Sequence, residues 1–262
     1  MVFAIMRLGL IFLHRDGHEP PELRGRALDT AATYRTAMAQ CLVFADYTKP
    51  HRYLIETMVL HVLAEIYQNR DGETSVWVLV GVVVRLAMRM GYHRDSKMFP
   101  DISVFQGEMR RRVWAFIRQA DLLFSYQVGL PGMIRPNDND TDLPRNLYEE
   151  DFDENSTELP PERPFNERTP ISYSITKSRL CSVFGRVLEY SQKIKGTSYE
   201  EIMDIDSELR RACETIPCHL RVRPMSECQN DAPALIVSRF GVSNISPAST
   251  IETVADYSLC RL

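Results

Sequence analysis

One segment limits the possible folds more than any other: an apolar run over residues 76–84 that continues to Gly91. Its first nine residues are rich in valine and, taken alone, would also suit a buried β-strand. The apolar pattern continues through residues 86–90, however, and the whole stretch is longer than an ordinary strand. Ser75 can cap the N-terminus of a helix, and Gly91 can adopt the left-handed conformation that commonly ends one. We therefore expect a helix from about Ser75 to Met90, apolar on nearly all sides and hence central in the fold.

Several other segments also indicate helices. Apolar residues recur along them at spacings of three and four, and no segment shows a convincing strand pattern. Two capping boxes, Ser103 with Gln106 and Ser198 with Glu201, mark helix starts. Further helices are expected over residues 22–45, from about Pro50 to Ile66, over 103–128, from Pro170 to Gly196 and over 198–216. The expected fold class is all-α, as a multi-helix bundle or an array of antiparallel helices.

The spacing of apolar residues also assigns an inward face to each helix. In the helix over 22–45, the inward residues are Leu28, Ala31, Ala32, Met38, Cys41 and Leu42. In the helix over 103–128, they are Phe105, Met109, Val113, Phe116, Ile117, Ala120, Phe124 and Val128. In the helix over 198–216, they are Ile202, Ile205, Leu209, Ala212 and Ile216.

Residues 136–170 form a long acidic, proline-rich connection with no helical period. We expect an extended segment that lies across the surface of the helices, or a partly mobile loop. Residues 1–240 are interpreted as one domain that includes this connection. Residues 241–262 have neither a firm periodicity nor clear caps and are left unassigned, with a truncated end as one interpretation.

Composition excludes several classes of protein. The net charge of the 262 residues is −4, whereas a domain that grips nucleic-acid phosphates is usually basic. The six cysteines are spread through the chain and mostly lie in apolar helical patterns, which favours reduced thiols over disulfides. No signal peptide is recognised at the N-terminus, and the longest apolar run is too short to span a bilayer. A soluble, intracellular protein is expected, with no membrane partner.

No arrangement of catalytic residues is found in the chain. His-Arg-Asp occurs at residues 14–16 and 93–95, as in the catalytic loop of protein kinases. That loop also needs an asparagine five residues after the aspartate, and these positions are Pro21 and Pro100. His61 lies in an apolar helix and is interpreted as a satisfied buried histidine. We therefore expect no enzymatic activity and no catalytic residues.

Two sets of residues partly match metal-site patterns, but neither match is complete. Asp138, Asp140, Asp142 and Glu149 match four positions of a calcium-binding loop, but the position that demands glycine is Leu143. The second set is Cys213, Cys218, His219 and Cys228, whose spacing fits no standard zinc pattern. The chain is expected to bind no metal and no other cofactor.

A structural polar cluster is expected to involve Arg85, Glu108, Arg112 and Asp121. Arg85 lies within the most apolar helix, and a buried guanidinium group needs a carboxylate partner. Three consecutive arginines on a helix point about 100° apart, so residues 110–112 cannot form one basic face. Intramolecular pairing is favoured, with Arg112 four residues from Glu108 and with Trp114 within reach of Arg110 and Arg118.

Residues 75–146 carry a resemblance to a known family. The first group of matching residues is Trp77, Gly81, Arg85-Leu86-Ala87 and Gly91-Tyr92-His93-Arg94-Asp95. The second group is Glu108, Arg110-Arg111-Arg112, Trp114, Asp121, Gly129, Pro131, Leu143 and Pro144. In this order and spacing they resemble the middle, regulatory homology domain of fungal binuclear zinc-cluster transcription factors. Ala115 and Leu130 depart from the pattern, and a looser match extends over residues 26–220.

The resemblance implies transcription regulation in the nucleus, with the zinc-dependent DNA-binding, RNA polymerase II-directed activity of the family. In that family the zinc cluster precedes this domain, and Met1 begins too late to include it. The chain is therefore expected to lack the cluster, as a natural short form, a truncated gene model or a degenerate copy. Expected partners are proteins, such as another family member, with DNA reached only indirectly and any small-molecule effector unknown.

Two further interpretations remain open. A helical small-molecule-binding protein or enzyme could share the same helical pattern, although it would need polar groups that converge in a pocket. A truncated copy without a function of its own is the other alternative.

Overall fold

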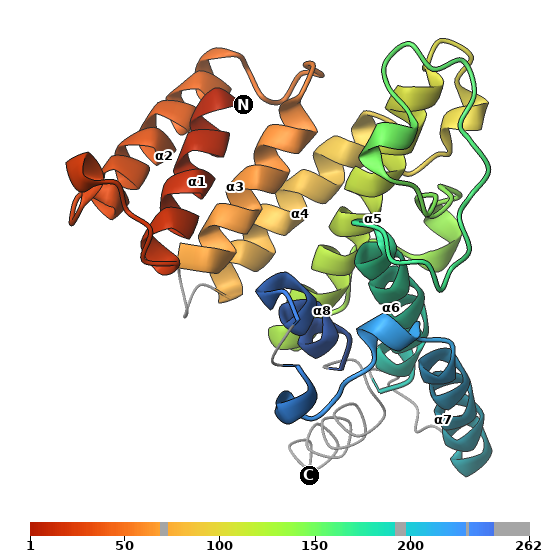
Figure 1. Cartoon of the computed structure of the whole chain (residues 1–262). Helices are drawn as coiled ribbons and strands as arrows, with labels where there is room; N and C mark the ends of the chain where they lie inside the picture. Colours follow the sequence, from red (N-terminus) through yellow and green to blue (C-terminus); the bar gives the residue numbers. More distant parts are fainter. Residues whose placement is uncertain (69–72, 192–197, 229–230, 244–262) are drawn as a thin grey trace. The chain divides into compact units, whose positions relative to one another are not determined.

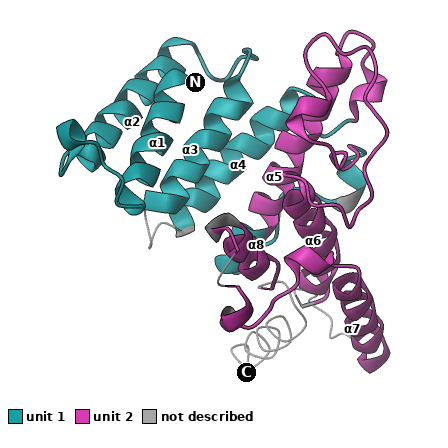
Figure 2. Ribbon diagram, viewed as in Figure 1, with its two compact units in different colours: residues 1–94, 123–140 teal, residues 95–122, 141–262 magenta. Residues whose placement is uncertain are grey.

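The structure is a computed structural model that describes residues 1–68, 73–191, 198–228 and 231–243. Within these residues the chain forms eight α-helices and several short 3-10 turns, with no strand. The expectation of an all-α fold is confirmed. The chain divides into two compact units, one comprising residues 1–94 and 123–140 and the other residues 95–122 and 141–262 (Figure 2).

Unit 1 is an array of helices. It contains α1 (Val2–Arg15), α2 (Ala27–Phe44), α3 (Leu54–Gln68) and α4 (Glu73–Arg89). The helix α1 packs against both α2 and α3, and α3 packs against α4, so that the spatial order is α2, α1, α3, α4 (Figure 1). Residues 123–140 complete the unit and contact α4, where the indole N–H of Trp77 donates to Ser125 Oγ at 3.2 Å.

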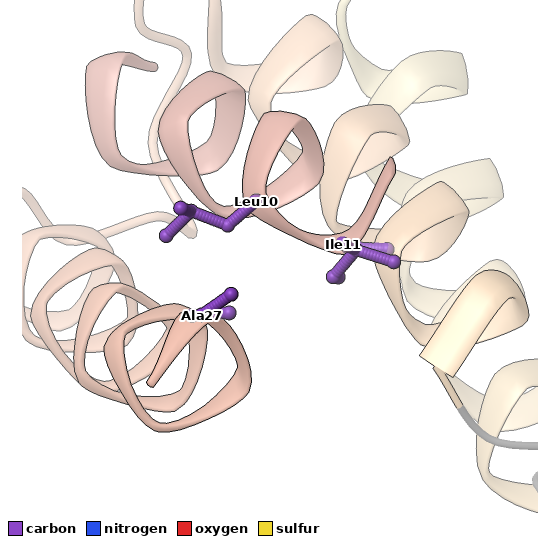
Figure 3. Close-up of a cluster of buried hydrophobic side chains, with 5 residues drawn as sticks. Leu10, Ile11 and Ala27 are labelled. Atoms are coloured by element: carbon purple, nitrogen blue, oxygen red, sulfur yellow. The ribbon is translucent and has the colours of Figure 1, made fainter. Parts of the chain in front are cut away.

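The core of unit 1 forms where α1 meets α2 and α3. Leu10 and Ile11 of α1 lie close to Ala27 at the start of α2 (Figure 3). Ala31 on the next turn of α2 and Ala64 of α3 are fully buried in the same cluster. Small residues on α2 and α3 allow these helices to approach α1 closely, so the larger side chains of α1 fill the space between them.

Unit 2 contains the first part of α5 (Val104–Gln127), together with α6 (Ser172–Ser191), α7 (Tyr199–Glu214) and α8 (Pro233–Ser243). The helix α6 packs against both α7 and α8. Ser198 caps α7, with both hydrogen bonds of the expected capping box to Glu201 present. Between α5 and α6 the described chain has no α-helix and no strand, and it forms 3-10 turns at Pro136–Asp138 and Glu149–Asp151.

Some helix boundaries differ from the sequence-based expectation. The helices α1 and α8 were not anticipated, and α2 begins at Ala27 because Pro21–Leu23 forms a separate 3-10 turn. The helix α4 begins at Glu73, so Ser75 lies inside it, while Gly91 has the expected positive φ of 75°. The expected stop at residues 69–72, the end of α6 at Ile194 and Gly196, and the unassigned residues 244–262 lie outside the described residues.

The inward faces of the helices are only partly those that the apolar spacing assigned. In α4 Val80 and Val84 are buried, but Val78 is 54% exposed, so this helix has a solvent-facing side. In α7 Ile205 and Leu209 are buried as expected, whereas Ile202 is exposed. The spacing of apolar residues identifies these helices correctly. An apolar side chain is buried, however, only where another segment of the chain packs against it.

The helix α5 shows the largest difference, because its buried face is largely polar. Glu108, Arg111 and Asp121 are all buried, alongside Trp114. Met109, which the apolar stripe placed inside, is 37% exposed. Charged side chains are buried only when other segments supply their partners.

Two further observations concern the whole of the described chain. None of its helices combines the length and the apolar character needed to cross a membrane. Cys41, Cys181, Cys213, Cys218 and Cys228 form no disulfide with one another, and Cys260 lies outside the described residues.

The core between α1 and α2 leads to a stability prediction. Ile11 is 3% exposed, so Ile11→Ala should lower the free energy of unfolding by about 2–5 kcal/mol, through lost burial and a residual cavity. The matched control is Val43→Ala on α2, where the side chain is 70% exposed and the change should stay within about 0.5 kcal/mol. Urea unfolding followed by circular dichroism measures both. Equal effects of the two substitutions would contradict this assignment of the core.

Candidate functional site

Asp95 lies just after α4 at the start of unit 2, and its carboxylate collects several hydrogen bonds. It caps the 3-10 turn Ser96–Met98 by accepting from the backbone N–H of Lys97 at 3.0 Å. It also accepts from the backbone N–H of Asp142 at 3.0 Å, which fixes the beginning of the extended connection. Asp95 is 6% exposed, so this carboxylate is a buried anion with two backbone donors.

Arg111 of α5 supplies the cation for Asp95. Its Nε and Nη2 donate to the two carboxylate oxygens of Asp95 at 2.9 and 2.8 Å, in the bidentate geometry that favours arginine over lysine. The approach depends on Gly107 one turn earlier, since a Cβ atom there would lie 2.5 Å from Ser96 Oγ. The absence of a side chain at this position allows α5 to contact the turn that Asp95 caps.

Glu108 continues the network on the same face of α5. Its side chain is fully buried and accepts from the backbone N–H of Arg145 at 3.2 Å and from Arg112 Nε at 3.2 Å. Arg111 Nη1 lies 3.9 Å from Glu108 Oε2 and thereby links the two carboxylates. We call Asp95, Glu108, Arg111 and Arg145 the polar latch.

Asn146 follows the polar latch and joins the extended connection to the start of α6. It is fully buried, and its side-chain amide donates to the carbonyl oxygens of Pro164 and Glu167 at 2.9 and 3.2 Å. Its Oδ1 accepts from Thr169 Oγ1 at 2.5 Å, and the carbonyl of Thr169 accepts from the Ser172 hydroxyl at the first residue of α6. The connection is therefore held to the helices of unit 2 by buried hydrogen bonds.

The two carboxylates of the polar latch have opposite pKa shifts. Burial by itself would raise the pKa of Asp95, but the hydrogen bonds from Arg111, Lys97 and Asp142 outweigh it and hold this pKa well below its usual range. For Glu108 burial dominates over the attraction of Arg112 and raises the pKa. The hydrogen bond to Asp95 raises the pKa of Arg111, so this pair is charged at every physiological pH.

The expected polar cluster can be compared with these positions. Glu108 and Arg112 lie on neighbouring turns of α5, with Arg112 Nε 3.2 Å from Glu108 Oε1. Asp121 is buried further along the same helix. Arg85 belongs to unit 1 and is exposed on α4, where its Nη1 donates to the carbonyl of Gly81 at 3.2 Å. The expected burial of Arg85 is therefore not found, because the apolar surface of α4 does not extend around the whole helix.

The three consecutive arginines of α5 have three different environments, as their 100° spacing requires. Arg111 is in the polar latch, while Arg110 lies 5.8 Å from the ring centroid of Phe99 and Arg112 lies 5.1 Å from that of Phe152. Arg110 and Arg112 thus lie against aromatic rings of the connecting segments. Each of the three arginines therefore contacts another group of the same chain.

The residues weighed as metal ligands have other neighbours in the structure. Asp140 pairs with Arg94 at 2.9 Å within unit 1, and Asp142 pairs with Lys97 at 2.6 Å within unit 2. His219 Nε2 lies 3.2 Å from Ser172 Oγ, and Cys228 Sγ lies 3.2 Å from Arg239 Nη1. Across the described ranges no three His, Cys, Asp or Glu side chains gather as they would around a metal ion.

A second buried polar network lies in unit 1. Arg7 of α1 is fully buried and pairs with Glu65 of α3 at 3.0 Å, while Arg35 of α2 donates to the same carboxylate at 2.7 Å. Arg7 Nη1 also lies 2.9 Å from His61 Nδ1, which must accept because a guanidinium can only donate. Burial lowers the pKa of His61 to about 4. His61 is therefore neutral in the folded protein, as a satisfied histidine.

Sequence reasoning missed Asp95, Arg111 and Arg7 as members of buried networks. The signal for Asp95 was its place directly after the Gly91 turn, where a short polar side chain can cap the next turn. For Arg111 the signal was its position three residues after Glu108, on one face of the helix. Arg7 was visible as the one charge in an apolar N-terminal stretch.

The polar latch leads to a prediction about stability. Arg111→Met leaves Asp95 buried without its cation, which should lower the free energy of unfolding by about 3–5 kcal/mol. The control is Lys97→Met, which breaks the nearby ion pair with Asp142; both of its side chains are more than half exposed, so about 1 kcal/mol or less should be lost. Chemical denaturation of both variants provides the test. A neutral Arg111→Met would show that the latch does not stabilise the fold.

His61 leads to a prediction about pH. Its pKa is lower in the folded state, about 4, than in the unfolded chain, about 6.5, so the unfolded state binds a proton first as the pH falls. The stability that neutral His61 contributes is therefore present above about pH 6.5 and is lost as the pH falls toward 4. His61→Asn keeps an acceptor for Arg7 but cannot titrate, so its stability should fall less over this interval. Urea unfolding at successive pH values measures the difference, and identical pH profiles would refute the assignment.

Comparison with known proteins places the chain in a family. The fungal specific transcription factor domain matches residues 1–213. The Zn(2)-C6 fungal-type transcription factor pigI of Monascus ruber is 43% identical over 91% of this chain and 29% of its own length. The transcription factor phm2 of a Pyrenochaetopsis species is 40% identical over 91% of this chain and 32% of its own. The equisetin cluster transcription factor eqxF of Fusarium heterosporum is 39% identical over 79% of this chain and 30% of its own.

No solved structure matches the chain. The chain spans about three tenths of the length of these relatives. The family match covers all of α1 to α6 and reaches into α7, so it includes both buried polar networks. The chain belongs to the fungal specific transcription factor domain family.

Proposed function

We propose that the chain is the regulatory domain of a zinc-cluster transcription factor that controls a gene cluster, and that it acts in the nucleus. The observation that carries this proposal is the 43% identity to pigI over 91% of the chain. The relatives pigI and eqxF are named as a Zn(2)-C6 fungal-type and a cluster transcription factor, respectively. Because the chain spans less than a third of each of these relatives, DNA recognition is assigned to other parts of such a protein or to a partner.

The buried networks support a role as a folded platform rather than as a catalyst. The residues that resemble the family pattern around Asp95, Glu108, Arg111 and Pro144 lie in or beside the polar latch. Their hydrogen bonds are satisfied by other protein groups, and this use of charged residues stabilises a fold instead of activating a nucleophile. We infer that the chain has no enzymatic activity and acts through protein contacts.

The charge of the chain supports an indirect relation to DNA. Affinity for DNA comes largely from neutralised phosphates and released counterions, and a net charge of −4 opposes this. We propose that these 262 residues bind neither promoter DNA nor zinc by themselves, and that a protein partner, such as an intact family member, brings them to a promoter.

A tethered reporter experiment tests this function. The complete chain is joined to an unrelated DNA-binding module, and transcription is measured from a reporter that carries the binding site of that module. Reporter output should differ from that of the module alone, in either direction, and the Arg111→Met variant should lose the effect because the latch holds the domain together. Lys97→Met serves as the matched control and should retain it.

The control for DNA binding is a mobility-shift titration of the chain without the module at physiological salt. No sequence-dependent complex is expected. A tight complex with one promoter sequence would refute the indirect relation to DNA. An unchanged reporter, with the fusion folded and present in the nucleus, would refute the regulatory role.

A further inference from the structure

Unit 1 contains a cavity of about 230 Å³ that neither buried network uses. It lies between the first turn of α1, the last turns of α2, the connection over residues 45–53 and the first turn of α3. All of its lining residues belong to unit 1, so its shape is set within one compact unit. Ligand sites in proteins are typically concave, mostly apolar and few in number.

The inner wall of the cavity is apolar and buried. Met38 of α2 and Leu54 of α3 are 2% and 5% exposed, and Leu42 lies one turn beyond Met38. Thr57 is the polar residue on this side, and its hydroxyl donates to the carbonyl of Tyr53 at 2.7 Å. The donor is thus occupied inside the protein, and the inner wall suits an apolar group.

The rim of the cavity carries an arginine, a histidine and tyrosines. Arg52 and His51 line it together with Tyr47, and no carboxylate is among the lining residues. The nearby carboxylate of Asp46 is engaged by Thr48 Oγ1 and, at 3.0 Å, by Lys49. The charge that a ligand would meet at the rim is therefore positive.

The connection that builds this rim holds an unusual backbone. Asp46 and Tyr53 both have positive φ, 53° and 63°, a conformation that is costly for residues other than glycine and is often found at binding sites. The guanidinium of Arg52 lies 4.7 Å from the ring centroid of Tyr53, and the carbonyl of Thr48 accepts from Arg89 of α4. The ring contact places the Arg52 guanidinium beside Tyr53 at the rim, and the Arg89 hydrogen bond ties the connection to α4.

We propose that this cavity binds a small apolar carboxylate, with its hydrocarbon part against Met38, Leu42 and Leu54 and its carboxylate at Arg52. The volume suits on the order of ten non-hydrogen atoms, given about 30 Å³ for each water molecule in the liquid. Arginine is the residue best suited to a carboxylate because its planar donors match the two oxygens. The inference rests on the proposed function, in which such a ligand would act as an effector of the regulatory domain.

Titration calorimetry with the complete chain tests this site, with octanoate as the probe and 1-octanol and octylammonium for comparison. Octanoate should bind about five- to tenfold more tightly than octanol, through a charge-assisted hydrogen bond at a partly exposed position. Octylammonium should bind most weakly, because its charge is like that of Arg52. The Arg52→Gln variant should bind octanoate no better than octanol and should leave the affinity for octanol unchanged.

Two tryptophan variants separate the cavity from other apolar surfaces. Leu42→Trp places a large side chain in the cavity and should abolish binding of octanoate and octanol. Val43→Trp is the matched control, since Val43 is the next residue, is 70% exposed and does not line the cavity. Circular dichroism of each variant establishes that it is folded before the titration.

The outcomes are decisive in both directions. Equal affinity for octanoate and octanol, retained binding by a folded Leu42→Trp variant, or no saturable binding of octanoate would each overturn the inference. The tethered reporter is read independently of these titrations. A chain that regulates the reporter but binds no octanoate refutes the site alone, and a chain that binds octanoate without any effect on transcription refutes the proposed function alone.

Discussion

The bidentate ion pair between Arg111 and Asp95 is the interaction on which the fold of unit 2 depends. A buried carboxylate is costly unless it is paired and hydrogen-bonded, and Asp95 meets both conditions with Arg111, Lys97 and Asp142. Because Asp142 lies in the connection between α5 and α6, the same carboxylate that caps a turn also fixes the path of a segment without an α-helix. Glu108 likewise accepts a hydrogen bond from the backbone N–H of Arg145. Two buried anions, Asp95 and Glu108, therefore order the connection.

Each unit contains a buried carboxylate that is paired with arginine. In unit 1, Glu65 of α3 accepts from Arg7 of α1 and Arg35 of α2, so one buried carboxylate joins three helices. A charged network specifies which elements pair more strictly than apolar contact does, because any other arrangement would leave a buried charge without a partner.

The resemblance to the zinc-cluster family has a physical meaning in this structure. The motif residues Asp95, Glu108 and Arg111 are parts of the polar latch, and Gly91 supplies the left-handed turn that delivers Asp95 to it. These residues serve the fold. Their presence therefore identifies a regulatory domain of this family, but it does not show where a ligand or a partner binds. The cavity in unit 1 lies outside those motifs, on a connection whose strained backbone at Tyr53 has no role in either network.

The sequence by itself determined the helical class, the capping box at Ser198, the turn at Gly91 and the family, because these depend on local spacing and on motif order. It could also pair Glu108 with Arg112, one turn apart on the same helix. Only the tertiary structure decided that α5 buries a charged face, that Arg85 is exposed and that Arg7 is enclosed. The partners of a buried charge come from segments far away in the sequence, and periodicity within one helix carries no information about them.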